Sequence, residues 1–188
     1  MKIRAPDPPL SDGVITLRQW TDADAPAVAD ACRDPEIAHW IDDIPAPYTR
    51  ADARTYISTA RRGWKDGSLW AFAVTDLATE EVLGSCGIGW QDRVQSVAEI
   101  GYWVRSQTRG RGIATRAVRL ASRWAFDACG VQRLQLRADT QNAASLRVAE
   151  RAGFHREGVL RSIRYSHRQQ RRVDFAIFSL LPGETPPE

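Results

Sequence analysis

The sequence has little that would specify a membrane, disulfide-linked or metal-binding protein. No apolar run reaches the roughly 18 to 20 residues that a membrane-spanning helix needs, and residues 1–10 contain prolines where a signal peptide would have its apolar stretch. The three cysteines, Cys32, Cys86 and Cys129, form no Cys-x-x-Cys pair, so we interpret them as reduced packing residues. The three histidines have no ligand spacing, and no metal site is expected. We therefore expect a cytoplasmic protein with no membrane partner.

Lysine is also scarce. Lys2 and Lys65 are the only lysines, so arginine supplies 24 of the 26 basic residues. The formal net charge is +3, a mild excess that suits an anionic ligand but is below what is typical of a nucleic-acid-binding domain. A nucleic-acid partner is therefore not expected. With 188 residues, of which 43% are hydrophobic and 26% charged, the chain should form one globular domain with its own core.

The domain is expected to span residues 13–181, between a loose N-terminal tail (1–12) and a loose C-terminal tail (182–188), both rich in proline and polar residues. The part of the domain before residue 69 is predicted to be mainly helical. A strand near 14–18 precedes a helix that begins with a capping-box pattern at Thr21 and Asp24, and a second helix is predicted over 50–64. Three strands then follow in an antiparallel meander, at 69–75, 82–90 and 97–104.

A buried helical stripe follows the meander and ends at Cys129-Gly130. It is formed by Ile113, Ala117, Leu120, Ala121 and Trp124. The next strand, 133–138, should lie parallel to 97–104 because a strand, helix and strand of this length form a right-handed crossover. The carboxyl ends of these two strands then define a ligand-facing edge. A short helix at 143–152 and a hairpin of 154–164 and 172–181 complete an α+β fold, with a mixed, mostly antiparallel sheet of about seven strands and helices on both faces.

The most informative segment is the glycine turn between strand 97–104 and the following helix. Its glycines let backbone amides approach a ligand, and the first turn of the helix presents unpaired amides to an anion such as a pyrophosphate. A P-loop would need Gly-Lys-Ser/Thr, and the sequence has Gly112-Ile113-Ala114; a Rossmann fingerprint would need a third glycine where Thr115 stands. Taken alone, the glycines could also serve only to make a tight turn.

The segment resembles the signature Gln/Arg-x-x-Gly-x-Gly/Ala of the GNAT superfamily of acyl-CoA N-acyltransferases, at Gln107, Gly110 and Gly112. A second similarity, to the Asn-x-x-Ser and Gly-Phe pattern of that family, occurs at Asn142–Ser145 and Gly153-Phe154. The two matches stand in the order and structural context that the family requires.

The branch that holds the ribosomal-protein alanine acetyltransferases resembles this chain in further places. These are Ala98–Val104, Glu157-Gly158 and Asp174. The resemblance extends over about residues 14–181.

The resemblance implies a binding site for acetyl-CoA, or for another acyl-CoA. Backbone amides of the turn would hold the pyrophosphate, with Thr115 nearby; they belong to Arg109, Gly110, Arg111, Gly112, Ile113 and Ala114. The side chains of Arg109 and Arg111 would add positive charge there. The pantetheine arm would pair with Trp103–Arg105, that is Trp103, Val104 and Arg105, and would contact Asn142. The Val104 amide would polarise the thioester carbonyl and stabilise the oxyanion.

Alternatives exist for three roles near the reacting atoms: the general acid, the general base and the wall of the acceptor groove. Many family members have a tyrosine acid four residues after the serine, where this chain has Ala149, so Ser145 is the candidate acid; its other role is a polar residue facing out of a short helix. Glu99 is the candidate base for the attacking amine, and is alternatively a salt-bridged strand glutamate. His39 and Trp40, between the first two predicted helices, would line the acceptor groove, or else are a packed tryptophan and its solvated neighbour.

The predicted reaction is direct attack of a primary amine, in a small molecule or at a protein N-terminus, on the thioester. An acyl-enzyme at Cys86 or Cys129 has no neighbouring base in its favour. The alternative to an enzyme is a CoA-sensing or RNA- or ribosome-binding module, for which the last hairpin offers a basic run: Arg161, Arg164, His167, Arg168, Arg171 and Arg172. A solvated hairpin face explains the same run. The family also leaves a homodimer open.

Overall fold

The computed structural model describes residues 5–186 and contains one mixed sheet of eight strands in the order β1-β2-β3-β4-β5-β6-β8-β7. The strands are β1 (Leu10–Ser11), β2 (Ile15–Gln19), β3 (Leu69–Asp76), β4 (Val82–Asp92), β5 (Val97–Val104), β6 (Arg133–Asp139), β7 (His155–Ser166) and β8 (Arg171–Leu180). Only β5 and β6 pair in parallel. The predicted fold class is confirmed.

The additional strand, β1, lies in the segment expected to be a loose tail. Leu10 and Ser11 pair with Leu17 and Thr16 of β2. Two residues are too short for a periodic pattern, so the sequence alone carried no signal for this strand. The outer parts of the two predicted tails, residues 1–4 and 187–188, lie outside the described residues.

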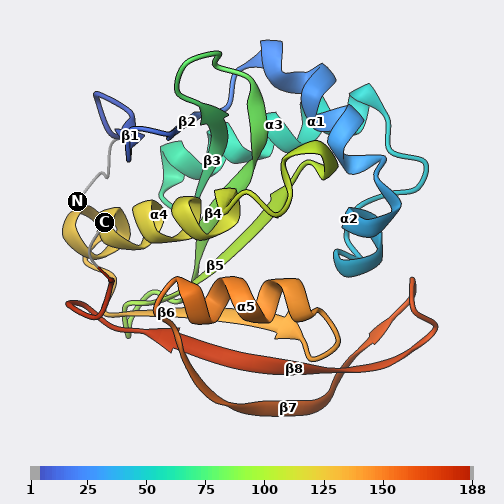
Figure 1. Ribbon diagram of the computed structural model, residues 1–188, viewed down its shortest axis with the longest axis vertical. Coiled ribbons are helices and arrows are strands. Elements are labelled where there is room, and N and C mark those ends of the chain that lie inside the picture. The colour runs from blue at the N-terminus through green and yellow to red at the C-terminus, as the bar shows by residue number, and fades with distance from the viewer. Residues whose placement is uncertain (1–4, 187–188) are drawn as a thin grey trace.

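Helices cover both faces of the sheet (Figure 1), as predicted. They are α1 (Ala25–Cys32), α2 (Pro35–Trp40), α3 (Arg50–Asp66), α4 (Ile113–Cys129) and α5 (Ala143–Arg151). One core cluster joins α4 and α5 to the large side chains of the sheet, and a second joins α1 and α3 to the opposite face through small residues such as Ala71 and Ala73. Of the helices, α2 was not predicted as a separate element. No helix in residues 5–186 is long and apolar enough to cross a membrane.

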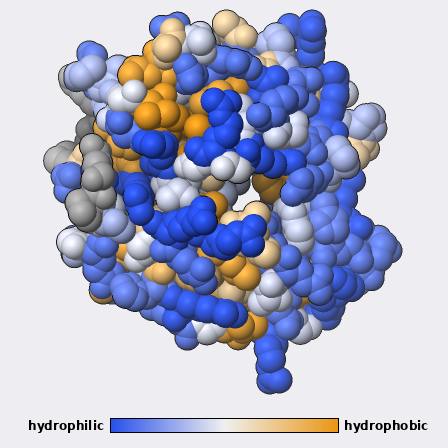
Figure 2. All heavy atoms as spheres, viewed as in Figure 1, coloured by the Kyte–Doolittle hydropathy of each residue, from blue (hydrophilic) through white to orange (hydrophobic). Residues whose placement is uncertain are grey.

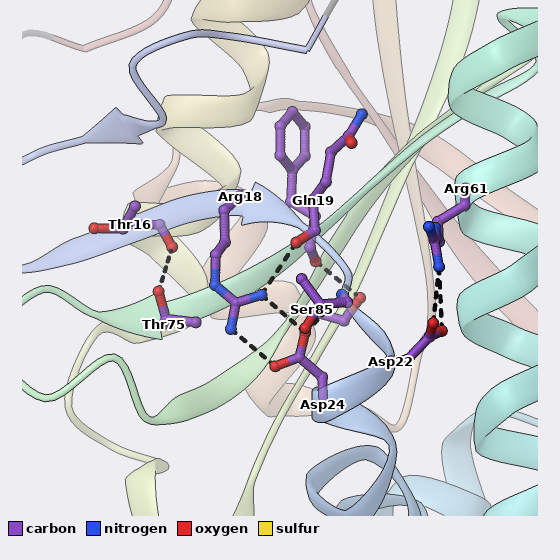
Figure 3. Close-up of polar contacts among 10 residues, drawn as sticks. Thr16, Arg18, Gln19, Asp22, Asp24, Arg61, Thr75 and Ser85 are labelled. Atoms are coloured by element: carbon purple, nitrogen blue, oxygen red, sulfur yellow. Dashed lines mark hydrogen bonds and ion pairs between the residues drawn. The ribbon is translucent and has the colours of Figure 1, made fainter.

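Polar contacts fix α1 and α3 to the edge of the sheet (Figure 3). Arg18 of β2 donates two hydrogen bonds of 2.8 Å to the Asp24 carboxylate, which also accepts the Thr21 N–H, as the capping pattern predicted. Burial opposes ionisation of Asp24, but the hydrogen bonds from Arg18 and Thr21 outweigh it and lower its pKa. Arg61 of α3 contacts Asp22 at 3.1 Å. The residues immediately before α1 are thereby held against both β2 and α3.

The crossover helix α4 follows its predicted stripe and ends at Gly130, whose φ of +69° closes the helix in the left-handed region. Trp124 on this stripe packs against the rings of Trp64, Trp70 and Phe72, with centroids 5.3 to 5.6 Å apart. These aromatic side chains are at most 7% exposed. These three tryptophans are therefore core residues, and together with Phe72 they hold α4 against α3 and β3.

The parallel strands β5 and β6 pair only at their beginnings. Residues 97–99 of β5 match residues 133–135 of β6, and beyond Glu99 no pairing continues. The two strands then diverge, which Figure 1 shows as a widening gap toward α2. The divergence lies toward the carboxyl ends of the two strands, at the edge where the crossover rule led us to expect a ligand.

Candidate active site

A cleft of about 500 Å³ occupies the divergence of β5 and β6. Figure 2 shows the molecular surface hollowed near the middle of this face, with hydrophilic residues around most of the rim. The cleft brings together these sequence-predicted site residues: Trp40, Glu99, Trp103, Val104, Arg109, Gly110, Gly112, Ile113, Ala114, Thr115, Asn142 and Ser145. Segments up to about a hundred residues apart in sequence thus meet in one concave site.

Three predicted residues do not line the cleft. The Arg105 side chain points to Asp30 and Glu81, with contacts of 3.0 and 2.8 Å. Arg111 is exposed on the turn. His39 is exposed on α2, edge-on to Trp40 at 4.5 Å, and only Trp40 reaches the cleft. The Arg105 side chain is therefore engaged outside the cleft, and the predicted contribution of Arg111 to phosphate binding stays a prediction.

The turn before α4 has the backbone geometry of an anion site. Gly110 and Gly112 have φ values of +76° and +78°, in the left-handed region that side chains disfavour. The first intrahelical bond runs from the Arg116 N–H to the Gly112 carbonyl, so the amides of Ile113, Ala114 and Thr115 have no partner within the helix. These amides, at the positive end of a 17-residue helix, can receive a pyrophosphate.

Arg109 lines the cleft, but its charge is already neutralised. Its guanidinium contacts Asp34 at 2.5 Å and Glu36 at 2.5 Å, both at the start of α2. The residue thus ties the turn to α2 rather than supplying free charge to a phosphate. These contacts span more than 70 residues of sequence, so the motif alone could not predict them.

The register of β4 and β5 orients the Val104 amide. The Arg105 N–H donates to the Leu83 carbonyl at 2.9 Å, and amides on one antiparallel strand alternate between its two sides. The N–H groups of Tyr102 and Val104 consequently point away from β4. That side is where β6 has separated, so these two donors face the cleft.

Glu99 is both a cleft residue and an ion-paired residue. Its carboxylate Oε2 lies 2.6 Å from Nη2 of Arg137 on β6, but the angle is outside hydrogen-bond geometry and Oε2 accepts no hydrogen bond. The Glu99 side chain is 25% exposed. The ion-paired alternative is thus present in the structure, on a carboxylate that also lines the cleft, and the role of Glu99 as a base stays a prediction.

Ser145 is hydrogen-bonded to Tyr102, a cleft residue that the sequence analysis missed. The Tyr102 hydroxyl lies 2.8 Å from Ser145 Oγ, and burial raises the pKa of Tyr102 to about 12, so the phenol stays protonated at neutral pH. Ala149, at the position where the family resemblance implied a tyrosine acid, is completely buried. The strand period offered one clue, because Tyr102 shares a face with Val104 two residues later. Asn142 caps α5 by accepting the Ser145 N–H at 3.0 Å.

The lining of the cleft also includes Trp40, Arg137, Arg164 and Phe175. The Arg164 guanidinium lies over the Phe175 ring at 4.9 Å and 3.6 Å from the Asp42 carboxylate. An acceptor entering between α2 and the β7–β8 hairpin would meet an aromatic wall with fixed charges.

Other chemistry has less support from the described residues. All three cysteines are buried and free, and burial raises the pKa of Cys86 and Cys129 to about 12, so neither is a thiolate at neutral pH. Within residues 5–186, no group of three His, Cys, Asp or Glu side chains is placed to hold a metal ion.

Comparison with known proteins agrees with this geometry. Residues 15–155 match the family described as "Acetyltransferase (GNAT) domain". The uncharacterized N-acetyltransferase p20 of Bacillus licheniformis is 28% identical over 170 residues, which are 90% of this chain and 94% of p20. The putative ribosomal N-acetyltransferase YdaF of Bacillus subtilis (strain 168) is 37% identical over 93 residues, 50% of each chain. A solved structure of RimL, a ribosomal L7/L12 alpha-N-protein acetyltransferase in complex with coenzyme A, superposes with a TM-score of 0.82 at 18% sequence identity. The superposition includes 92% of this chain and 96% of the RimL chain.

Proposed function

This chain belongs to the GNAT family of acetyltransferases and is an acetyl-CoA-dependent N-acetyltransferase, and we propose that its acceptor is the α-amine at the N-terminus of a protein or peptide. The observation that carries the choice of acceptor is the contact between Glu99 and Arg137. The Glu99 carboxylate of the cleft is engaged by Arg137, so the site suits an amine that needs little help from a base to lose its proton.

The two classes of acceptor make very different demands. An α-amine with a pKa near 7.8 is about one-third neutral at pH 7.5, whereas a lysine-like amine near 10.4 must be deprotonated at a cost of roughly 4 kcal/mol. Glu99, directly or through water, can take the proton that an α-amine releases on attack. The similarity to YdaF, whose name is putative ribosomal N-acetyltransferase, supports an acceptor that belongs to the ribosome.

In the proposed donor complex, the pyrophosphate of acetyl-CoA lies on the amides at the start of α4. The pantetheine arm runs along the open edge of β5, where the Val104 N–H points away from β4 and donates no hydrogen bond to it. The thioester carbonyl then points at that N–H. Removing such an oxyanion donor typically costs about 2.7 to 4 kcal/mol of transition-state stabilisation.

Transfer proceeds by one substitution at the thioester carbon. The amine lone pair forms the C–N bond, the C–S bond breaks through a tetrahedral oxyanion, and the extra amine proton passes to Glu99 and then to solvent. The departing thiolate takes the proton of the Ser145 hydroxyl, which is replenished by Tyr102 at 2.8 Å and then by solvent. The Tyr102–Ser145 pair takes the place of the tyrosine absent at Ala149.

The hairpin arginines give little support to the RNA-binding alternative. Arg164 contacts Asp42, Arg168 bonds to the Ile44 carbonyl, Arg171 bonds to Gln141, and Arg172 bonds to Ser162. These side chains hold the hairpin to neighbouring loops and to itself. An RNA ligand would have to compete with those contacts.

The proposal is tested by incubating the protein with acetyl-CoA and one of three acceptors: a peptide with a free N-terminal alanine, the same peptide with a blocked N-terminus and one internal lysine, and spermidine. Mass spectrometry should locate the acetyl group on the free α-amine, with much slower reaction of the other two acceptors at pH 7.5. Faster acetylation of spermidine or lysine would overturn the proposed acceptor class. Salt-sensitive RNA binding without acetyl transfer would favour the binding module.

A further inference from the structure

Gly84 of β4 lies directly opposite the peptide group that carries the Val104 N–H. Gly84 is paired with Val104 in the β4–β5 register and is buried. A methyl group built on its α-carbon would stand 2.3 Å from the Trp103 carbonyl oxygen and 3.2 Å from the Val104 α-carbon. The Trp103 carbonyl therefore occupies the space that a side chain at position 84 would need.

This carbonyl belongs to the same peptide plane as the Val104 N–H. In a trans peptide the C=O and N–H bonds point in opposite directions, so the carbonyl tilted against Gly84 directs the N–H away from β4 and toward the cleft. We propose that Gly84 is a positioning residue for acyl transfer, whose missing side chain sets the orientation of the Val104 oxyanion donor. This inference rests on the proposed function, because it assumes that the Val104 N–H binds the thioester carbonyl.

The surrounding contacts prevent the strands from relieving a clash by sliding apart. The end of β5 is tied to the residues before Gly84, since both the Arg105 N–H and the Thr108 hydroxyl donate to the Leu83 carbonyl, at 2.9 and 3.3 Å. On the other side, Ser85 is held by the Tyr56 hydroxyl at 2.8 Å and donates to the Phe72 carbonyl at 3.3 Å. The Trp103–Val104 peptide is therefore the part that must move.

The required movement is large for a catalytic donor. Ordinary contact with a carbonyl oxygen begins at 3.4 Å, so a side chain at position 84 would displace the Trp103 oxygen by about 1 Å from its 2.3 Å position. Misplacement of a reacting group by that amount can lower a rate about 10²-fold. Binding of the CoA pyrophosphate, on the amides of α4, should not depend on this peptide plane.

The strand offers a matched control. A methyl group at Gly87, also on β4, would meet its nearest atom at 3.7 Å, which is ordinary contact. Gly84→Ala and Gly87→Ala are thus the same chemical change on one strand, and they differ in whether the Val104 peptide must shift.

The experiment is carbon-13 NMR of [1-¹³C]acetyl-CoA bound to the full chain, which needs no acceptor. In the wild type and in Gly87→Ala, the bound carbonyl signal should move downfield from free acetyl-CoA because the carbonyl accepts a hydrogen bond. In Gly84→Ala most of that shift should disappear while the Kd stays within about threefold, and kcat with an N-terminal alanine peptide should fall about 10²-fold.

The outcomes distinguish a failure of the proposed donor site from a failure of the proposed role of Gly84. If the wild type neither binds acetyl-CoA nor shifts its carbonyl signal, the proposed donor site fails. If the wild type shows the shift and Gly84→Ala retains both the shift and kcat, the role of Gly84 is wrong while the proposed function stands. Should Gly84→Ala not fold, a crystal structure of the wild type with acetyl-CoA decides: a Trp103 carbonyl lying in the plane of the sheet, clear of Gly84, would overturn the inference.

Discussion

Replacing Tyr102 with phenylalanine should separate a catalytic role of its hydroxyl from a structural one. The substitution keeps the ring and removes only the oxygen that lies 2.8 Å from Ser145 Oγ. Loss of one hydrogen bond of this kind costs about 0.5 to 1.5 kcal/mol of stability. A general acid contributes about 10²- to 10⁴-fold to rate, and we expect the lower end, about 10²-fold in kcat, because Ser145 still reaches the thiolate.

The assay is kcat and the melting temperature measured together for Tyr102→Phe, Ser145→Ala and the double variant. If Tyr102 acts only through Ser145, the double variant should lose no more activity than Ser145→Ala alone. Tyr165→Phe, on the exposed hairpin, is the matched control and should keep full activity. Because the pKa of Tyr102 is about 12, wild-type activity should not decline from its ionisation below about pH 10. A lowered melting temperature with unchanged kcat in Tyr102→Phe would refute the relay.

Three further outcomes test the rest of the structure. Gly112→Ala forces a side chain into a φ of +78°, which costs about 1 to 2 kcal/mol, and calorimetry should find weaker CoA binding, whereas Gly158→Ala should bind normally. Arg18→Gln should destabilise the fold by about 2 to 3 kcal/mol, less than breaking a fully buried pair because Arg18 is 27% exposed. Arg18 lowers the pKa of Asp24, so the difference in unfolding free energy between the wild type and Arg18→Gln should be complete above about pH 4. The difference should shrink as the pH falls through the folded-state pKa of Asp24, which unfolding measured at a series of acid pH values would detect. Iodoacetamide should leave activity intact in the native protein; rapid inactivation would point to a reactive cysteine.

Local patterns in the sequence predicted the parts of the fold that depend on local chemistry. The stripe of α4 and its end at Gly130 follow from helical periodicity and a left-handed glycine cap. The parallel pairing of β5 with β6 follows from the handedness of the crossover. The glycines at positions 110 and 112 likewise marked the turn, where both residues have positive φ.

Features that depend on distant contacts could not be predicted in the same way. The pairing of Arg109 with Asp34 and Glu36 joins segments more than 70 residues apart, and the contact of Tyr102 with Ser145 joins segments 43 apart. Neither leaves a periodic signal. For α2 a signal was present, since Asp34 caps a helix that has Pro35 in its first turn, but six residues are too few for a helical period to stand out.

The most direct test of the central claim is a crystal structure of the protein with acetyl-CoA. The thioester carbonyl oxygen should lie about 3 Å from the Val104 nitrogen, with the pyrophosphate on the amides of Ile113, Ala114 and Thr115 and the sulfur beside Ser145. A complex in which the pyrophosphate binds the hairpin arginines, or the thioester carbonyl lies away from Val104, would contradict the account.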